Sequence, residues 1–360
     1  MDSNEHKKKI LYVVEAMGGG VLTYIVDLVN ELANQFEMYV AYAVRPQTPL
    51  DYKDYFDKRV KLIEVKNFCR EISLKKEISA IKELKEIAEK IQPDIIHLHS
   101  SKAGVIGRIA FNGKDTPLFY TPHGYSFLMQ NYKPIKRWIF KMIETVFAKR
   151  ECITISCSPG EHKETLKLTS KATYVNNAIN VEKLDKRVGK LEEKQHPFTV
   201  YTLGRICYQK NPSMFNEIAR ALPDIRFLWI GDGELREQLD SNNIEITGWV
   251  ERDEALKKCV NADVFLLTSL WEGLPMSLLE SMYMKKICVV SNVIGNNDVI
   301  HNGENGFVCD TICDYVGAIR TAMNEDLMPY ISNATDKIDT IYNTKTQANS
   351  YAEIYNKYIK

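Results

Sequence analysis

The sequence has no long hydrophobic run and no regular cysteine pattern, and each absence argues against a class of protein. After a basic start, the first apolar run, "ILYVV", is too short to span a membrane and resembles a buried strand more than a signal peptide. Cys309 and Cys313 lie close together, but no second cysteine pair faces them, which argues against a zinc site. Other cysteines, such as Cys288 in "ICVV", lie in apolar runs and indicate buried thiols. We therefore expect a globular protein of the reducing cytoplasm.

The chain also lacks net charge, yet its charges are unevenly divided. Up to Gln195 there are 32 Lys+Arg against 25 Asp+Glu (+7), and the remainder has 15 against 22 (−7). Residues 101–150 alone carry nine basic and two acidic residues. This asymmetry predicts that one half meets an anionic surface or ligand, with an ordinary solvated basic face as the alternative.

Short apolar runs alternate with helical patterns along the chain, and this alternation predicts the fold class. A chain of 360 residues is expected to form two domains. The apolar runs are mostly uninterrupted, as is typical of parallel strands covered on both faces. Two successive strand–helix series predict two doubly wound α/β domains, with a ligand near the carboxyl ends of the strands. The expected strands are 10–14, 38–44, 60–65, 94–99, 118–121 and 152–157, then 198–203, 225–230, 244–247, 264–267 and 287–290.

The same pattern predicts the domain boundaries. A first domain is expected over 1–183, a highly charged linker over 184–197 and a second domain over 198–334. The closing segment, 335–360, has a helical and polar pattern. We expect it to form a helix that packs on the outside and that can cross back to the first domain.

A glycine-rich stretch, "EAMGGGVLTY", follows the first expected strand. Its glycines make a turn into a helix whose N-terminal amides can hold an anion. They do not form the G-x-G-x-x-G pattern of dinucleotide-binding domains, which argues against a nicotinamide-dependent dehydrogenase. A tight turn alone needs one or two glycines, so we predict a functional role for Gly18 and Gly19.

Two cations follow the expected strand 198–203, in "TLGRICYQKNP". Arg205 and Lys210 lie behind Gly204 in a loop that leads into a helix opening near Pro212. A planar guanidinium and an ammonium converging on one loop suit a diphosphate. The alternative is that both are simply solvated loop residues, but their place after a buried strand favours the functional interpretation.

A histidine ends the expected strand 118–121, in "YTPHGYSF". His123, between Pro122 and Gly124, is predicted to face the ligand, and a purely structural histidine is the alternative. His97 and His99 point to one face of another strand and complete a possible set of three metal ligands. No carboxylate or cysteine accompanies them, so we predict no metal site.

Two glutamates flank an apolar run in "SLWEGLPMSLLESM". Glu272 lies in the loop after the expected strand 264–267, and Pro275 suits the first turn of the helix that follows. Glu280 lies a little over one turn into that helix, which can direct its carboxylate towards the same region. Two surface glutamates are the alternative.

The ordered motifs together resemble glycosyltransferase family four over essentially the whole chain. The Glu–seven residues–Glu spacing in "EGLPMSLLESM" is similar to that family's signature. "GRICYQKN" resembles its diphosphate loop and "TPHG" its first-domain histidine segment, while "IGDGE" and "ITGWV" match two further landmarks in order. The resemblance implies a GT-B fold, with two Rossmann-like domains facing a cleft, and a retaining transferase that uses a nucleotide-diphosphate sugar, expected to be a UDP-sugar, without a metal or other cofactor.

The resemblance also assigns roles to the donor-side residues. Arg205 and Lys210 would bind the diphosphate and stabilise it as it leaves. Glu280 would accept the ribose hydroxyls of the nucleotide. Glu272 would contact the donor sugar, with the backbone amides of Gly273 and Leu274 nearby.

The remaining roles concern the base, the sugar and the acceptor. Gly248 would border the base, His123 would contact the sugar from the first domain, and Gly18 and Gly19 would line the acceptor side. The expected acceptor is a glycan, or one linked to undecaprenyl diphosphate, in capsule or lipopolysaccharide synthesis, and no nucleic-acid partner is expected. The sequence departs from the family at Asp298, where a glutamate is usual.

Two other functions compete with this interpretation. A nucleotide-sugar epimerase of the same fold should lack the Arg–Lys loop paired with the two glutamates. A non-catalytic nucleotide-sugar or glycan-binding module is disfavoured by the intact cationic loop and by both glutamates.

A basic amphipathic segment lies in the first domain, in "NYKPIKRWIFKMIETVFAKR". Its apolar residues follow helical spacing from Ile135 through Met142 to Val146, and lysines and arginines lie between them. This pattern is typical of interfacial membrane binding and favours peripheral contact with an anionic membrane, at the inner face of the cell membrane. The alternative is that the apolar face packs on the sheet while the lysines face water.

Overall fold

The computed structural model describes residues 7–15, 17–45, 48–68, 74–191 and 194–359. Residues 1–6, Cys69, positions 192–193 of the expected linker and the final lysine lie outside the described residues. The chain forms two compact units. Unit 1 comprises Met1–Leu128, Pro134–Asn177 and Thr344–Lys360, and unit 2 comprises Met129–Lys133 and Ala178–Asn343.

Unit 1 contains a seven-stranded sheet in the order β3-β2-β1-β4-β5-β6-β7, with every neighbouring pair parallel. The strands are β1 (Lys9–Val14), β2 (Glu37–Tyr42), β3 (Lys61–Glu64), β4 (Ile95–His99), β5 (Leu118–Thr121), β6 (Ile153–Ser156) and β7 (Ala172–Tyr174). The helices are α1 (Gly19–Leu32), α2 (Leu74–Ile91), α3 (Ser101–Ala110), α4 (Pro134–Phe147), α5 (Pro159–Leu166) and α12 (Thr344–Asn356), with short 3-10 turns at Tyr52–Tyr55 and Ser126–Leu128.

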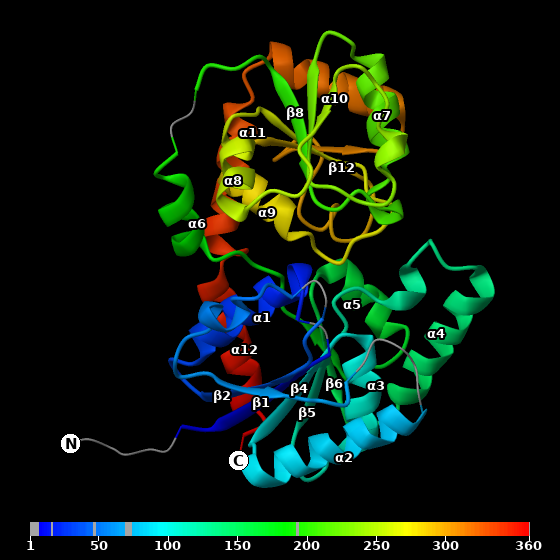
Figure 1. Cartoon of the computed structure of the whole chain (residues 1–360), viewed down its shortest axis with the longest axis vertical. Helices are drawn as coiled ribbons and strands as arrows, with labels where there is room; N and C mark the ends of the chain where they lie inside the picture. The colour runs from blue at the N-terminus through cyan, green and yellow to red at the C-terminus, as the bar shows by residue number, and fades with distance from the viewer. Residues whose placement is uncertain (1–6, 16, 46–47, 69–73, 192–193, 360) are drawn as a thin grey trace. The chain divides into compact units, whose positions relative to one another are not determined.

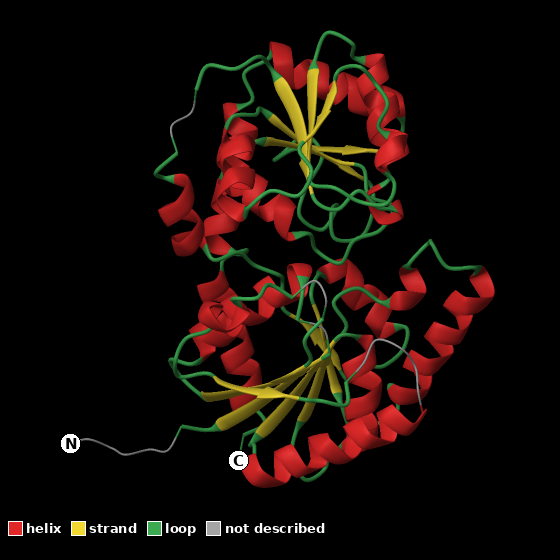
Figure 2. Ribbon diagram, viewed as in Figure 1, coloured by secondary structure: helices red, strands yellow, loops and turns green. Residues whose placement is uncertain are grey.

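Helices cover both faces of this sheet, which explains why its strands are uninterrupted apolar runs (Figure 2). Successive residues of β1 point to opposite faces. Tyr12 and Val14 pack in a cluster with α1 and α12, whereas Leu11 and Val13 pack in a second cluster with residues of α2 and α3. The last helix of the chain therefore completes the core of unit 1, next to its first helix (Figure 1).

Unit 2 contains a six-stranded parallel sheet in the order β10-β9-β8-β11-β12-β13. The strands are β8 (Thr199–Leu203), β9 (Arg226–Ile230), β10 (Ile244–Ile246), β11 (Val264–Leu267), β12 (Ile287–Ser291) and β13 (Phe307–Cys309). The helices are α6 (Val181–Val188), α7 (Pro212–Ala221), α8 (Arg252–Val260), α9 (Met276–Tyr283), α10 (Ile312–Asn324) and α11 (Met328–Thr340), with 3-10 turns at Tyr208–Lys210 and Arg236–Gln238. Here too, two apolar clusters lie on opposite faces of the sheet.

The structure contains a strand at each of the eleven expected places and adds two. The added strands, β7 and β13, are each three residues long and lie at a sheet edge. Their apolar pattern is too short to distinguish from a loop. The segment expected to be helical, 335–360, contains α12 and the last six of the thirteen residues of α11, separated by a break near Asn343. Among the residues described, five cysteines are buried free thiols, and burial raises the pKa of Cys152 and Cys259 to about 12.

In the part of the chain that the structure describes, no helix is long and apolar enough to cross a membrane.

Candidate active site

The predicted site residues follow the carboxyl ends of the central strands in each unit. The strand order reverses direction between β1 and β4 in unit 1, and between β8 and β11 in unit 2. Loops leaving the strands at such a point diverge to opposite faces of the sheet and leave room for a ligand. Gly18 follows β1, Arg205 follows β8 and Glu272 follows β11. Each unit therefore presents its candidate residues at the place where doubly wound sheets bind ligands.

In unit 2, close contact between two backbone segments shapes the loop after β8. Gly204 has φ +147°, and a Cβ added to the neighbouring Gly231 would lie 2.2 Å from the Gly204 carbonyl oxygen. Only glycine at position 231 permits this approach. The loop then presents Arg205, whose side chain is 64% exposed and whose Nε lies 3.0 Å from Oε2 of Glu234.

Lys210 and Glu272 form an ion pair that joins the loops after β8 and β11. Lys210 Nζ lies 2.7 Å from Glu272 Oε1, and the two side chains are only 17% and 8% exposed. Ser269 Oγ donates to the same carboxylate oxygen at 2.7 Å, and Gln209 Nε2 donates to Oε2 at 3.2 Å. Both oxygens of Glu272 are thus held in place, which fixes the carboxylate before any ligand arrives.

Glu280 is buried in α9, where the guanidinium of Arg252 forms an ion pair with it. Pro275 is the extended residue directly before α9 rather than part of its first turn, so the helix begins one residue later than the proline pattern predicts. Glu280 therefore lies at the fifth position of the helix.

The predicted backbone contributors of unit 2 also lie in tight turns. Gly248 has φ +73° and forms an isolated bridge with Gly231, while Leu274 is buried. A Cβ on Gly295 would lie 2.3 Å from the carbonyl oxygen of Gly273. Asp298, the residue that departs from the family pattern, accepts a hydrogen bond from the Gly295 amide at 3.1 Å and so supports this turn.

In unit 1, His123 lies in a strained turn directly after β5. Its φ is +55°, in the left-handed region that most residues avoid, and Gly124 follows with φ +92°. The buried carboxylate of Glu161 accepts hydrogen bonds from the amides of Gly124 at 2.7 Å and Cys157 at 2.8 Å. These bonds hold the turn and determine where the His123 ring lies.

Three histidines of unit 1, His97, His99 and His123, lie together and are neutral. His99 Nδ1 lies 3.0 Å from His123 Nε2, and the rings of His97 and His99 are 4.2 Å apart between centroids. Burial, followed by the neighbouring imidazoles, lowers the pKa of His97 and His99 well below the usual value, and burial lowers the pKa of His123 to about 3. At neutral pH these rings are hydrogen-bonding groups rather than cations.

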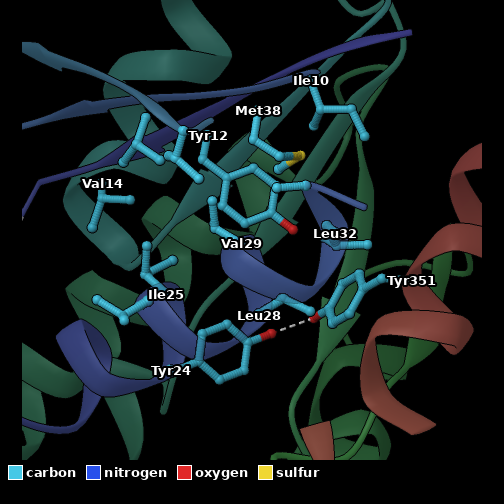
Figure 3. Close-up of a cluster of buried hydrophobic side chains, with 14 of the residues drawn as sticks. Ile10, Tyr12, Val14, Tyr24, Ile25, Leu28, Val29, Leu32, Met38 and Tyr351 are labelled. Atoms are coloured by element: carbon cyan, nitrogen blue, oxygen red, sulfur yellow. Dashed lines mark hydrogen bonds between the residues drawn. The ribbon is translucent and has the colours of Figure 1, made fainter. Parts of the chain in front are cut away.

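Hydroxyls of α12 complete this cluster. Tyr355 lies 2.6 Å from His97 Nδ1 and 2.8 Å from the Tyr12 hydroxyl. Tyr351 bonds Tyr24 at 2.6 Å across the gap between α12 and α1, as Figure 3 shows. Tyr24 in turn contacts the ring of His123 edge-on, with 4.6 Å between centroids. The tyrosine hydroxyls of α12 therefore help to hold the histidine rings in place.

The glycine turn of unit 1 is open. Gly18 is the residue before α1, Gly19 has φ +55°, and a Cβ on Gly19 or Gly20 would meet no atom within 4 Å. The first turn of α1 carries no acidic side chain. Its amides can therefore receive an anionic or hydroxylated ligand.

No group of three or more His, Cys, Asp or Glu in the described ranges is arranged to hold a metal ion. His97 bonds Tyr355 through one ring nitrogen and Thr121 Oγ1 through the other, at 2.9 Å. Both of its ring nitrogens are thus engaged in hydrogen bonds within the unit.

Sequence reasoning missed three kinds of supporting residue. Arg252 pairs with Glu280, Gln209 and Ser269 hold Glu272, and Glu161 holds the His123 turn. Most of these residues are distant in sequence from their partners, and the others are residue types that are common in any loop. No motif spacing therefore indicates their role. The exception is Ser269, three residues before Glu272, where a short polar residue is typical of a turn.

Comparison with known proteins identifies the family. The chain matches the models "Glycosyltransferase Family 4" over residues 18–183 and "Glycosyl transferases group 1" over 197–325. It is 31% identical, over 84% of its length and 85% of the relative's, to an Escherichia coli protein named UDP-Gal:alpha-D-GlcNAc-diphosphoundecaprenol alpha-1,3-galactosyltransferase. It is 26% identical to the capsular polysaccharide biosynthesis glycosyltransferase CapM of Staphylococcus aureus, over 69% of this chain and 74% of that protein.

A solved structure supports the fold. The sucrose-phosphate synthase of Thermosynechococcus elongatus superposes with a TM-score of 0.81 at 16% identity, covering 98% of this chain and 99% of that one. The predicted family and the predicted pair of doubly wound domains are confirmed. This chain belongs to the group 1, or family 4, glycosyltransferases and has their GT-B fold.

Proposed function

We propose that this glycosyltransferase moves a hexosyl group from a UDP-sugar to a glycan linked to undecaprenyl diphosphate, with retention of configuration, in cytoplasmic steps of surface-polysaccharide synthesis. The Escherichia coli relative is named for a UDP-galactose donor and an undecaprenyl-diphosphate acceptor, and the Staphylococcus aureus relative for capsular polysaccharide. The observation that carries the proposal is the largely buried Lys210–Glu272 pair, with the exposed Arg205 on the same loop.

The cations suit the leaving group. When the bond between the sugar and the diphosphate breaks, negative charge develops on the β-phosphate, and a cation already held there stabilises it. Lys210 has three N–H donors, one of which bonds Glu272 at 2.7 Å. The guanidinium of Arg205 is largely exposed and can bind two phosphate oxygens at once. These two charges do the work that a divalent cation does in other transferases.

The glutamates suit hydroxyl groups. The carboxylate of Glu272 is held by Lys210, Ser269 and Gln209, so it can accept a sugar hydroxyl without reorganising. The amides of Gly273 and Leu274 lie beside it in the chain. Glu280 is fixed by Arg252 and is assigned to the ribose hydroxyls, and the turn at Gly248 to the border of the base.

The unit 1 residues suit neutral contacts. His123 is uncharged at neutral pH, so it offers the donor sugar a hydrogen bond rather than a proton-transfer group. The open turn at Gly18 and Gly19 is assigned to the acceptor side.

The proposal is tested by incubating the purified chain with a panel of radiolabelled nucleotide sugars and a lipid-diphosphate-linked monosaccharide acceptor. Transfer of label to the lipid fraction, dependent on both substrates, is the expected result. Conversion of the nucleotide sugar to its epimer without acceptor would instead indicate an epimerase. Tight binding of a nucleotide sugar with no turnover on any acceptor would indicate a binding module.

The metal-free part of the proposal has its own test. A chelator should leave the transfer rate unchanged, because Arg205 and Lys210 supply the positive charge. Restoration of a lost rate by Mg²⁺ or Mn²⁺ after chelation would contradict it. The chelated enzyme should be assayed with saturating donor, so that a weak metal–nucleotide effect does not mimic a catalytic requirement.

A further inference from the structure

Helix α4 of unit 1 is oriented with its apolar side outward. Glu144 is the only residue of this helix that is buried among the described residues. Its carboxylate bonds Arg108 of α3 at 2.8 Å and the Tyr120 hydroxyl of β5 at 2.9 Å. An amphipathic helix of a globular protein normally buries its apolar stripe. Here a charged residue occupies the inward position.

The buried ion pair fixes the rotation of α4. Arg108 and Glu144 are both almost fully buried, and the guanidinium lies 4.3 Å from the centre of the Tyr120 ring. Breaking such a pair leaves an uncompensated buried charge, so the pair resists any turn of the helix that would bring the apolar side inward. Arg137 adds a second attachment, donating from Nε to the Phe127 carbonyl at 2.9 Å.

The opposite side of α4 is an exposed apolar stripe. Its members recur at helical spacing along the whole helix and are between 38% and 64% exposed: Ile135, Trp138, Ile139, Met142, Ile143 and Val146. The alternative expectation, that this face packs on the sheet, is therefore wrong. The inward position is taken by Glu144. Figure 1 shows α4 at the margin of unit 1.

Positive charge borders this stripe. At 100° per residue, Lys136 lies on one side of it and Lys141 on the other, and Lys149 and Arg150 follow at the C-terminal end. All four are exposed, whereas the single acid of the helix is buried against Arg108. The outward surface of α4 thus combines apolar side chains and cations.

We propose that α4 docks this enzyme on an anionic phospholipid bilayer, lying in the plane of the interface with Trp138 and Met142 at the centre of the inserted stripe. Charge complementarity selects the occupant. Lysines beside a lipid-facing apolar stripe contact phosphate head groups, whereas an apolar protein partner would leave four cations unmatched. This surface is independent of the proposed donor site. Vesicle binding requires neither the donor nor the acceptor, so the membrane-binding proposal can be tested whatever sugar the enzyme transfers.

The test is co-sedimentation of the full chain with vesicles of phosphatidylglycerol and phosphatidylcholine. Binding should rise with the fraction of phosphatidylglycerol and fall with added NaCl. Replacing Lys136, Lys141, Lys149 and Arg150 with Gln should weaken partitioning by about a hundredfold or more, since each cation near an anionic surface contributes about fivefold. A separate variant, W138S with M142S, should abolish binding at every salt concentration.

The matched control comes from α2 in the same unit. Lys76, Lys82, Lys85 and Lys90 are also exposed, but α2 packs its apolar side in the core through Leu84 and Ile91. Changing these four lysines to Gln removes the same charge and should weaken binding by less than about threefold. An equal loss in both variants would overturn the proposal, because it would show that overall charge rather than α4 drives binding.

Tryptophan fluorescence shows which segment inserts. Vesicles should shift the emission to shorter wavelength, and W138F, which keeps an apolar ring, should bind while losing most of that shift. An unchanged shift in W138F would place the contact elsewhere and overturn the assignment to α4. So would failure to bind anionic vesicles at low salt. Self-association of the chain without lipid, abolished by W138S with M142S, would instead assign the stripe to a second copy.

Discussion

The carboxyl edges of the two sheets have the same topology but contrasting chemistry. In unit 1 the edge carries His97, His99 and His123, all kept neutral because burial lowers their pKa. In unit 2 the edge carries a charged pair, Lys210 and Glu272, joined at 2.7 Å. Both edges lie where the strand order reverses. The fold therefore supplies the position, and the local side chains decide whether a neutral or a charged partner is bound.

The contrast arises from where the groups sit relative to the strand ends. His97 and His99 belong to β4 itself and are completely buried, so water cannot solvate a charged form. Lys210 and Glu272 lie in loops beyond β8 and β11, where each is compensated by the other. In the proposed reaction the charged edge receives the diphosphate and the neutral edge receives hydroxyls.

The largest effect is expected from removing the charge of unit 2. K210A should lower kcat/KM by about 10²–10³, the typical value of one fixed group that stabilises a developing anion. It also leaves the nearly buried Glu272 without its cation. R205A should have a similar effect. Steady-state transfer assays with the identified donor measure both.

The control for these variants is R226A. Arg226 starts β9, at the opposite end of the strands, and forms an exposed ion pair with Glu245. Its loss should change kcat/KM by less than about threefold, because Arg226 lies away from the proposed donor site and an exposed pair contributes only about 0.2–1 kcal/mol to folding stability. Near-wild-type turnover in K210A and R205A, with folding intact, would show that the charged edge is not the diphosphate site.

A smaller effect, divided between two constants, is expected at the glutamates. E280A should weaken nucleotide binding by about 10- to 100-fold, because a hydrogen bond to a charged acceptor is worth about 1.5–3 kcal/mol. E272A should mainly lower kcat, since this carboxylate is assigned to the sugar. Isothermal titration with UDP, combined with single-turnover rates, separates the two.

Replacing Arg252 tests the role assigned to Glu280 through its ion-pair partner. It pairs with Glu280 but is itself 41% exposed, so R252A should weaken UDP binding less than E280A does, by about fivefold. Identical UDP affinities in E272A and E280A would contradict the division of roles between them.

Much of the fold was predictable because buried parallel strands produce uninterrupted apolar runs. β1 and β4, for example, are buried almost throughout and stand out in the sequence. The short edge strands β7 and β13 were missed, because a run of only three residues carries no distinctive period. The position of Glu272 and Glu280 around a Leu-Pro turn was visible, since a proline marks where a helix can begin.

The partners of the site residues were not predictable. Arg252 reaches Glu280 from 28 positions away, and Glu161 reaches Gly124 from 37 positions away. Such pairs depend on how separate helices are placed, which local patterns do not specify. The orientation of α4 was also ambiguous. Its pattern fits both a packed and an exposed stripe, and the buried Arg108–Glu144 pair, distant in sequence, decides between them.

The smallest effect is expected from the neutral edge of unit 1, and it concerns stability. Because the folded-state pKa of His123 is lowered to about 3, the unfolded chain binds a proton at this residue at a higher pH than the folded chain does. Stability is therefore intact above about pH 6.5, the ordinary histidine pKa, and is lost as the pH falls below it.

Replacing His123 with Asn, which tolerates its φ of +55°, removes this proton. Between pH 7 and pH 5.5 the free energy of unfolding should fall by about 1 kcal/mol less in the variant than in the wild type, as measured by urea unfolding. Above pH 7 the two stability curves should run parallel, because all three histidines are then neutral in both states. Curves that stay parallel down to pH 5.5 would mean that His123 titrates alike in both states, and the contrast between a neutral and a charged edge would then rest on His97 and His99 alone.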